Sequence, residues 1–268
     1  MIKTSFFTNK YALSVILLVC CLLADIILHR GMSRVIIPAT FTEKRKPQNF
    51  KNCNAPLIHH TKRWLKSVGN IAAMQQLPKE TDGFQLNVYF NADGNILKIH
   101  NDSLSVAALN ADTLLNIYKQ RNLTASLWFN LKNLNANNSA AIFSLMLHLR
   151  QQYNLFNKII IVSDAPQYLN NYCDSGFFTA YNVPNFNPYK MPEDTLVKYI
   201  DIMASNLKKF PVSAVAGSYF QYPVLKKYFP NFPILTWTDK TTLSLVSSVF
   251  NTRLENDPQV KIVLYPYQ

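Results

Sequence analysis

The chain has 268 residues, of which 49% are hydrophobic and 13% aromatic, so it can bury a sizeable core and is not an intrinsically disordered protein. Its formal net charge of +12 favours anionic partners: phosphate esters, phospholipid head groups or nucleic acid. The sequence contains no arginine-rich helix, zinc-finger spacing or RNA-binding aromatic signature, so we do not expect nucleic acid as a partner.

The N-terminal segment predicts a membrane helix. Residues 12–28 (ALSVILLVCCLLADIIL) are apolar apart from Ser14 and Asp25, and they are numerous enough for a short membrane span. The run is longer than most signal-peptide cores, and no small-x-small cleavage site follows it. We therefore expect residues 1–34 to form a single-pass anchor. The alternative is a cleaved signal segment and a secreted protein, and basic residues on both flanks leave the orientation open.

A polar segment at residues 35–54 contains Lys44-Arg45-Lys46 and predicts a basic linker next to the membrane. Outside the anchor the cysteines are Cys53 and Cys173. We expect the soluble part to lie on the exported side, where a disulfide between these two is possible, but the sequence does not decide whether they pair.

From residue 55 to 268, apolar strand patterns alternate with helical patterns. The predicted strands are 56–60, 84–90, 125–131, 158–163, 177–181, 212–216, 233–238 and 259–264. The predicted helices are 62–76, 111–120, 139–153, 167–172, 192–209, 222–228 and 241–251. Apolar strands such as IIIV suit a parallel sheet that is buried on both faces. Eight strands separated by helices predict a (β/α)8 TIM barrel rather than an open sheet. An open sheet usually carries a glycine-rich phosphate loop, and this sequence has none.

Polar residues fall at the carboxyl ends of the predicted strands, where such barrels place their sites. His59 and His60 close the first predicted strand, and Gln85 and Asn87 share a face of the second. The remaining candidates are His100 beyond the second strand, Asn130 and Lys132 on one face of the third, and Trp237 at the end of the seventh.

This order of residues resembles the phospholipase C-like phosphodiesterase superfamily, which includes glycerophosphodiester phosphodiesterases and spider-venom sphingomyelinase D. The family pattern is a histidine after strand one, Glu-x-Asp on strand two, a second histidine, an acid-x-Lys on strand three and a tryptophan near strand seven. Here the second histidine, His100, lies thirteen residues after Asn87. The resemblance covers most of residues 55–268, and it implies a TIM barrel with phosphoric diester hydrolase ancestry.

The resemblance implies roles for three residues. His60 and His100 would act as the general acid and base, and Lys132 would neutralise the phosphoryl oxygens. His59 is the alternative to His60. We choose His60 because the family's Ala-His-Arg pattern then falls on His59-His60-Thr61, although Thr61 replaces the arginine.

The chain departs from the family at the metal ligands. Gln85, Asn87 and Asn130 stand where three carboxylates would hold Mg²⁺ or Ca²⁺, which neutral amides rarely do alone. We therefore expect no metal or other cofactor. The amides could form a hydrogen-bonded polar layer, and with Lys132 and Trp237 they could bind a phosphate ester.

Three hypotheses follow for the function. The first is a membrane-anchored, metal-free and catalytically degraded protein that binds a phosphodiester or phospholipid head group. The second is an active metal-independent phosphodiesterase that uses His60, His100 and Lys132. The third is a non-catalytic scaffold next to the membrane.

Overall fold

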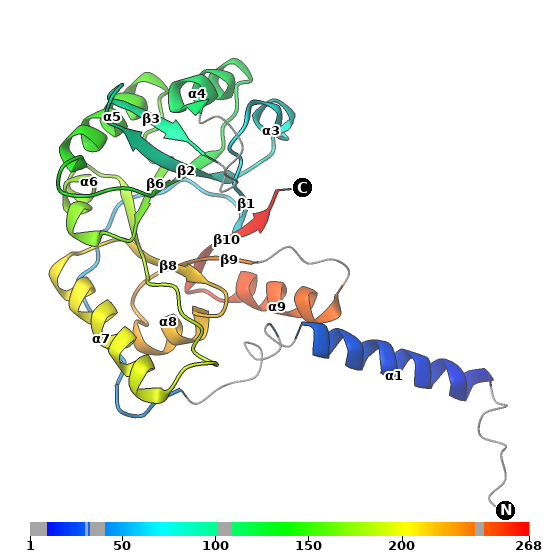
Figure 1. Ribbon diagram of the computed structural model, residues 1–268. Coiled ribbons are helices and arrows are strands. Elements are labelled where there is room, and N and C mark those ends of the chain that lie inside the picture. Colours follow the sequence, from blue (N-terminus) through cyan, green and yellow to red (C-terminus); the bar gives the residue numbers. More distant parts are fainter. Residues whose placement is uncertain (1–9, 30–31, 33–40, 101–108, 239–243, 268) are drawn as a thin grey trace, which may run out of the picture.

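The computed structural model of the protein describes residues 10–29, 32, 41–100, 109–238 and 244–267. Within them, eight parallel strands close into a barrel that helices surround (Figure 1). The first strand pairs with the last, and the pairing of Leu65 with Phe84 joins the first strand to the second and closes the ring. The predicted TIM-barrel fold is confirmed. The barrel strands are β1 (Arg63–Lys66), β2 (Gly83–Asn91), β5 (Ser126–Leu131), β6 (Ile159–Ser163), β7 (Phe178–Asn182), β8 (Ala214–Ser218), β9 (Ile234–Trp237) and β10 (Val260–Pro266).

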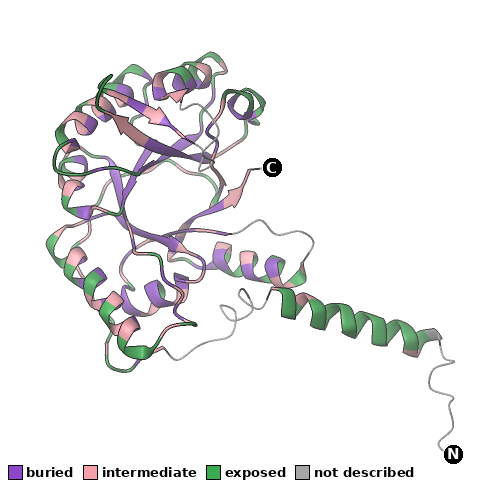
Figure 2. Ribbon diagram, viewed as in Figure 1, coloured by how far each residue is buried: buried purple, intermediate pink, exposed green. Residues whose placement is uncertain are grey.

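Helices cover the outside of the barrel and bury their apolar faces against the strands (Figure 2). They are α3 (Ile71–Gln76), α4 (Ala111–Gln120), α5 (Ser139–Gln152), the 3₁₀ helix η1 (Pro166–Tyr168), α6 (Asn170–Asp174), α7 (Glu193–Lys209), α8 (Tyr222–Tyr228) and α9 (Leu245–Asn256). Two short strands, β3 (Ile96–Ile99) and β4 (Leu109–Asn110), extend the sheet: β3 runs antiparallel to β2, and β4 runs antiparallel to β3. The hairpin that joins β2 to β3 places His100 back beside β2.

Side chains fill the barrel interior, as strand alternation requires. Large and small apolar residues both contribute to it. The inner cluster is Trp64, Trp128, Ile160, Val162, Phe178, Ala180, Ala214, Ala216, Leu235, Ile262 and Leu264. Gly83 faces the same space, and a Cβ atom there would clash with the ring of Trp64. A glycine at the start of β2 is therefore what lets the indole lie inside the barrel.

The first strand differs from its prediction. The predicted strand 56–60 is wrong, and β1 lies at Arg63–Lys66 inside the segment that we expected to be helical. Its sequence, RWLK, has charged ends and no apolar run, so strand patterning does not mark it. Tertiary contact makes it a strand, because the fully buried Trp64 packs inside the barrel. Residues 56–60 instead cross the amino end, where Leu57 packs against the inner cluster.

From Phe41 onward, the segment that we assigned to a basic linker is packed on the barrel. Its Thr42 hydroxyl donates to Glu193 at the start of α7 at 2.6 Å. The Arg45 guanidinium donates two hydrogen bonds to Asp201, at 2.6 and 2.7 Å. Lys44 and Arg45 are thus paired with carboxylates of α7, and the segment runs along the barrel as a strap.

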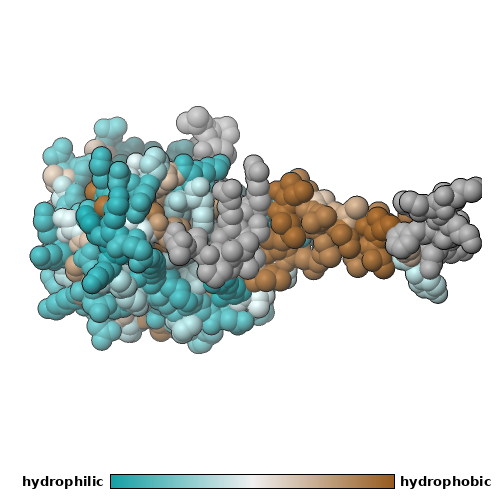
Figure 3. Space-filling model, turned by 90° about the horizontal axis from the view of Figure 1, so that it is seen from below, coloured by the Kyte–Doolittle hydropathy of each residue, from teal (hydrophilic) through white to brown (hydrophobic). Residues whose placement is uncertain are grey.

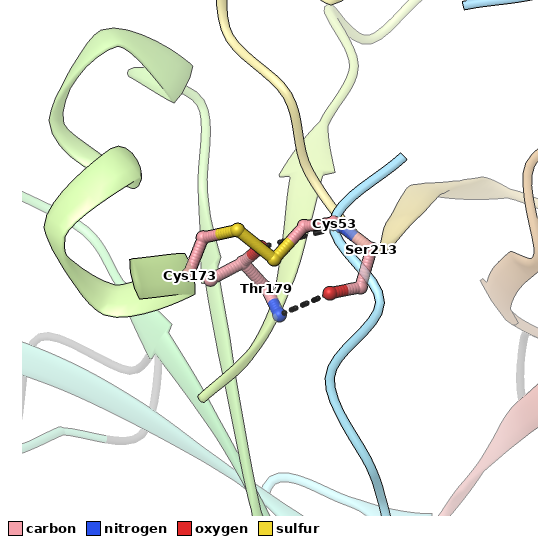
Figure 4. The surroundings of a disulfide bond; sticks show 4 residues. All are labelled: Cys53, Cys173, Thr179 and Ser213. Carbon is pink, nitrogen blue, oxygen red and sulfur yellow. Dashed lines mark hydrogen bonds between the residues drawn. A yellow bond between two sulfur atoms is a disulfide. The ribbon is translucent and has the colours of Figure 1, made fainter. Parts of the chain in front are cut away.

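A disulfide fastens the end of this strap. Cys53 is bonded to Cys173 of α6, with Cα atoms 6.1 Å apart (Figure 4). Beside it, Thr179 and Ser213 exchange hydrogen bonds: each main-chain N–H donates to the partner's side-chain hydroxyl, and Ser213 N–H also donates to the Thr179 carbonyl at 3.0 Å. The pairing that the sequence left open is formed in the structure.

The N-terminal helix α1 (Lys10–Leu28) projects from the barrel (Figures 1 and 3). Of the described residues, Tyr11–Leu28 form the one helix that is long and apolar enough to cross a membrane, and a signal sequence would pass the same test. The apolar side chains of this helix are exposed all round, while the face of the barrel seen in the same view is largely hydrophilic (Figure 3).

Candidate functional site

Three amide side chains form a buried cluster near the carboxyl end of the barrel. Asn87 on β2 and Asn130 on β5 are direct neighbours in the sheet, and Gln85 lies two residues earlier on the same face of β2. The Oδ1 atom of Asn87 accepts hydrogen bonds from Asn130 Nδ2 at 3.0 Å and from Gln85 Nε2 at 3.4 Å. Gln85, Asn87 and Asn130 are 6%, 3% and 8% exposed. The cluster is a polar layer whose two donating NH₂ groups each keep a second hydrogen for another acceptor.

His100 and Lys132 meet this cluster at the barrel mouth. His100 lies opposite Asn87 after the β2–β3 pair, and its main-chain N–H donates to the Asn87 carbonyl at 3.1 Å. The Lys132 N–H donates to the Val88 carbonyl at 2.9 Å and so continues the β2–β5 ladder. Strand alternation then places the exposed Lys132 side chain on the same face as Asn130. The predicted residues of the second and third strands are thus brought together.

A second lysine, which sequence analysis missed, lies at the same end. Lys66 is the last residue of β1, and the pairing of Leu65 with Phe84 places it next to Gln85. Trp64, two residues earlier, lies in the inner cluster, so Lys66 also faces the barrel interior. It is half-buried.

The misplaced first strand hid Lys66, because the predicted helix 62–76 gave this side chain no particular direction. The pattern that could have found it is Trp64-x-Lys66 directly before Ser67, whose φ of 61° marks a sharp turn. In the part of the chain that the structure describes, neither Lys66 nor Lys132 forms an ion pair. The mouth therefore holds two ammonium groups without a carboxylate partner from those residues.

Trp237 ends β9 and contributes to the wall of the same mouth. It is half-buried and packs against the inner cluster. Two strands, β1 and β10, separate it from β2, so it stands across the mouth from the amide cluster. A ligand-binding role for Trp237 stays a prediction. Asp239, which follows it, and Asp102, which follows His100, lie outside the described residues.

His60 lies at the opposite end of the barrel. It precedes β1, and its main-chain N–H donates to both carboxylate oxygens of Asp82 at 2.9 Å. The same carboxylate accepts a hydrogen bond from Trp64 Nε1 at 3.3 Å, so Asp82 fixes the entry into β1. His59, the alternative, lines a hollow at this amino end. The expectation that His60 and His100 lie together is therefore wrong. Strand β1 begins after His59 and His60, so these two histidines lie at the amino end of the barrel, away from the mouth.

The amide cluster does not fit a divalent metal ion. Mg²⁺ and Ca²⁺ are held mainly by anionic oxygen ligands, whereas these three side chains are neutral. The side-chain oxygen of Asn87 already accepts two hydrogen bonds. Across the described ranges, no group of three or more His, Cys, Asp or Glu side chains is placed to hold a metal ion. The mouth instead offers hydrogen-bond donors and ammonium groups, which are suited to binding an anion.

Neither a protein-family model nor a curated protein matches the chain. Solved structures resemble it at the level of the backbone. A protein assigned as a glycerophosphoryl diester phosphodiesterase from Silicibacter pomeroyi DSS-3 gives a TM-score of 0.54 at 10% identity, over 79% of this chain and 91% of that chain. One assigned as a glycerophosphodiester phosphodiesterase from Galdieria sulphuraria gives 0.52 at 10% identity, over 78% and 94%.

A glycerophosphodiester phosphodiesterase from Parabacteroides distasonis ATCC 8503 gives a TM-score of 0.50 at 14% identity, over 82% of this chain and 93% of that chain. At such identities the likeness concerns the fold, not the residues of the site. The barrel that the sequence resemblance implied is the fold this chain shares with glycerophosphodiester phosphodiesterases.

Proposed function

We propose that the barrel mouth binds the phosphate group of a phosphodiester or phospholipid head group without a metal ion. One observation carries this proposal: the buried amide cluster is flanked by Lys66 and Lys132, which have no ion-pair partner in the described part of the chain. Amide NH₂ groups and ammonium groups are donors, and charge-assisted hydrogen bonds to phosphate oxygens are strong.

We infer that catalysis is weak or absent. Hydrolysis of a phosphodiester needs one group to deprotonate the nucleophile and another to protonate the leaving oxygen. The expected partner of His100, His60, is held at the other end of the barrel through Asp82. His100 beside Asn87 is the observation that keeps an active, metal-independent phosphodiesterase as the second candidate.

We also infer that α1 stays attached as a membrane anchor. The carboxylate of Asp25 accepts the main-chain N–H of Leu245 at 2.9 Å, so the helix is joined to the barrel. Met32, just beyond α1, is 3% exposed and packs in the core. Cleavage of a signal segment near residue 34 would discard both contacts. The Cys53–Cys173 disulfide suits the exported side, because disulfides persist in oxidising compartments.

Calorimetric titration of the full chain in nanodiscs, with a chelator present, tests the proposal. Glycerophosphocholine and inorganic phosphate are the soluble probes, and phosphatidylcholine vesicles supply the lipid. We expect Lys66→Met and Lys132→Met each to weaken binding about tenfold or more, since each removes a charge-assisted contact. Lys119→Met on α4, which removes an exposed lysine far from the mouth, is the matched control and leaves binding unchanged.

The same samples separate the three functions. Binding without release of choline supports the proposal. Metal-independent hydrolysis that is lost in His100→Ala supports the enzyme instead. If none of these probes binds, or if Lys119→Met weakens binding as much as Lys66→Met, the phosphate site is refuted and the scaffold hypothesis stands.

A further inference from the structure

The membrane anchor is joined to one particular helix of the barrel. Asp25, in the last turn of α1, accepts hydrogen bonds from the first two N–H groups of α9, those of Leu245 at 2.9 Å and Val246 at 3.1 Å. His29 lies 2.9 Å from the other oxygen of the Asp25 carboxylate. A carboxylate at a helix N-terminus satisfies N–H groups that have no partner within the helix. Asp25, the acidic residue of the predicted span, thus has a structural role, and it joins α1 to α9.

Beside this junction, α9 exposes two large aliphatic side chains. Leu245 and Val249 lie one turn apart on the outer face and are 62% and 57% exposed. The inner face of the same helix is anchored by Phe250 and Leu254, which are fully buried. Single exposed aliphatic residues are ordinary on a protein surface. Leu245 adjoins the base of α1, whose apolar side chains are exposed all round, and Val249 lies one turn further along α9. The apolar surface therefore continues from the anchor onto the barrel.

The length of the anchor sets where this junction lies. Eighteen helical residues, Tyr11–Leu28, span about 27 Å, close to the thickness of about 30 Å of a bilayer's hydrocarbon core. When the helix crosses the bilayer, Asp25 and Leu28 therefore lie at its boundary with the head groups. Leu245 is hydrogen-bonded to Asp25 and must lie at that boundary too.

We propose that the outer face of the first two turns of α9 lies on the membrane, with Leu245 and Val249 in the interfacial region. The Asp25 carboxylate holds the barrel in that orientation. This inference rests on the proposed anchor. It adds a consequence for the site, because α9 begins after the carboxyl end of β9, which ends at Trp237. The wall of the mouth that contains Trp237 is then the wall nearest the lipid, and the phosphate ligand comes from the same membrane.

Site-directed spin labelling of the full chain in phosphatidylcholine vesicles tests this orientation. The background carries Cys20→Ala and Cys21→Ala, which removes the free thiols of α1 and keeps the disulfide. Labels are placed by Leu245→Cys and Val249→Cys on α9. The matched control is Ile202→Cys on α7, a residue that is 48% exposed and lies away from α1, and Leu17→Cys reports on the anchor itself.

The measured quantity is the ratio of collisions with oxygen, which concentrates in lipid, to collisions with a water-soluble nickel chelate. We expect labels at positions 245 and 249 to give a ratio several-fold above that at 202. Asp25→Ala should lower the ratio at 245 and 249 to the value at 202 and leave the ratio at 17 high. That last result separates loss of orientation from loss of insertion.

Other outcomes contradict the proposal in distinguishable ways. A low ratio at 245 and 249 with a high ratio at 17 refutes the membrane-facing surface but keeps the anchor. Shielding from both reagents, together with a cross-linked dimer, assigns the face to a second copy of the chain instead. A low ratio at 17 means that α1 does not insert, and the proposed anchor itself then fails.

Discussion

Two buried polar atoms next to the candidate site have no hydrogen-bond partner among the described residues: Gln85 Oε1 and Trp128 Nε1. Both side chains face the barrel interior from paired positions on β2 and β5. A buried polar atom without a partner costs about 1–3 kcal/mol of stability. The polar side chains at this site thus lower the stability of the folded protein, as is common for residues that are kept for binding.

Substitutions in the amide cluster should therefore change the free energy of unfolding in a predictable way. Gln85→Met removes the unpaired oxygen and one weak donor, while Asn87 Oδ1 still accepts from Asn130 at 3.0 Å. We expect the free energy of unfolding to stay the same or rise by up to about 1 kcal/mol, measured by urea denaturation. Asn87→Leu is the contrasting variant: it leaves two NH₂ donors without their acceptor and should cost about 1–3 kcal/mol. Equal losses in both variants would contradict this account.

Restoring carboxylates tests whether positions 85, 87 and 130 correspond to the metal ligands that the family resemblance implies. We expect the triple variant Gln85→Glu, Asn87→Asp and Asn130→Asp to bind Ca²⁺ or Mg²⁺ in the millimolar range, because three anionic oxygens on neighbouring strands would then converge. Isothermal titration of the wild type and the variant measures it. Absence of binding in a variant that remains folded by circular dichroism would show that the family's metal ligands do not map to these positions.

At the scale of elements, the junction between α8 and α9 is held by a buried carboxylate. Asp257 accepts hydrogen bonds from the Tyr222 hydroxyl and the Lys226 ammonium. Burial acts to raise the pKa of Asp257, but these hydrogen bonds outweigh it and hold the pKa below its ordinary value of 3.8. Because the pKa is lower in the folded state, this contribution to stability is present above the ordinary pKa and is lost as the pH falls below it.

The contribution of Asp257 can be tested by unfolding the protein in acid. Asp257→Asn should lower the free energy of unfolding at neutral pH and reduce its further loss below pH 3.8, as measured by urea denaturation across that range. Asp201→Asn is the control, because Asp201 pairs with Arg45 at a half-exposed surface, where an ion pair is worth about 0–1 kcal/mol. A larger effect at Asp201 than at Asp257 would contradict the assignment.

At the scale of the whole molecule, the strap from Phe41 onward ties the anchor to the barrel. It is held by the Arg45–Asp201 ion pair near α7 and by the Cys53–Cys173 disulfide, whose cysteines are 120 residues apart in sequence. Beyond the disulfide, Leu57 covers the amino end of the inner cluster. The residues that follow the strap thus complete the barrel, while a truncation that begins at residue 55 would remove the disulfide and the ion pair.

We expect Cys173→Ser to lower the free energy of unfolding by about 2–5 kcal/mol, because the cross-link restricts the unfolded chain. Thermal denaturation of the oxidised wild type, the variant and the reduced wild type measures this difference. Cys20→Ala with Cys21→Ala should leave the midpoint unchanged, since both thiols lie on the exposed face of α1. Equal midpoints for oxidised and reduced wild type would refute a stabilising disulfide.

The sequence by itself determined the barrel, the membrane-length helix and the convergence of Gln85, Asn87, His100, Asn130 and Lys132. Strand periodicity and the carboxyl-end rule act over a few residues, so a local pattern suffices for each.

Only the tertiary structure decided which residues complete the mouth. Trp64 becomes part of a strand because the closing barrel buries it against Gly83, a contact between segments that no local pattern contains. That one pairing brought Lys66 into the mouth and left His60 at the far end beside Asp82. Closure of the barrel and the disulfide both join residues that are far apart in the chain. Such contacts depend on how the whole molecule packs and not on a local sequence pattern.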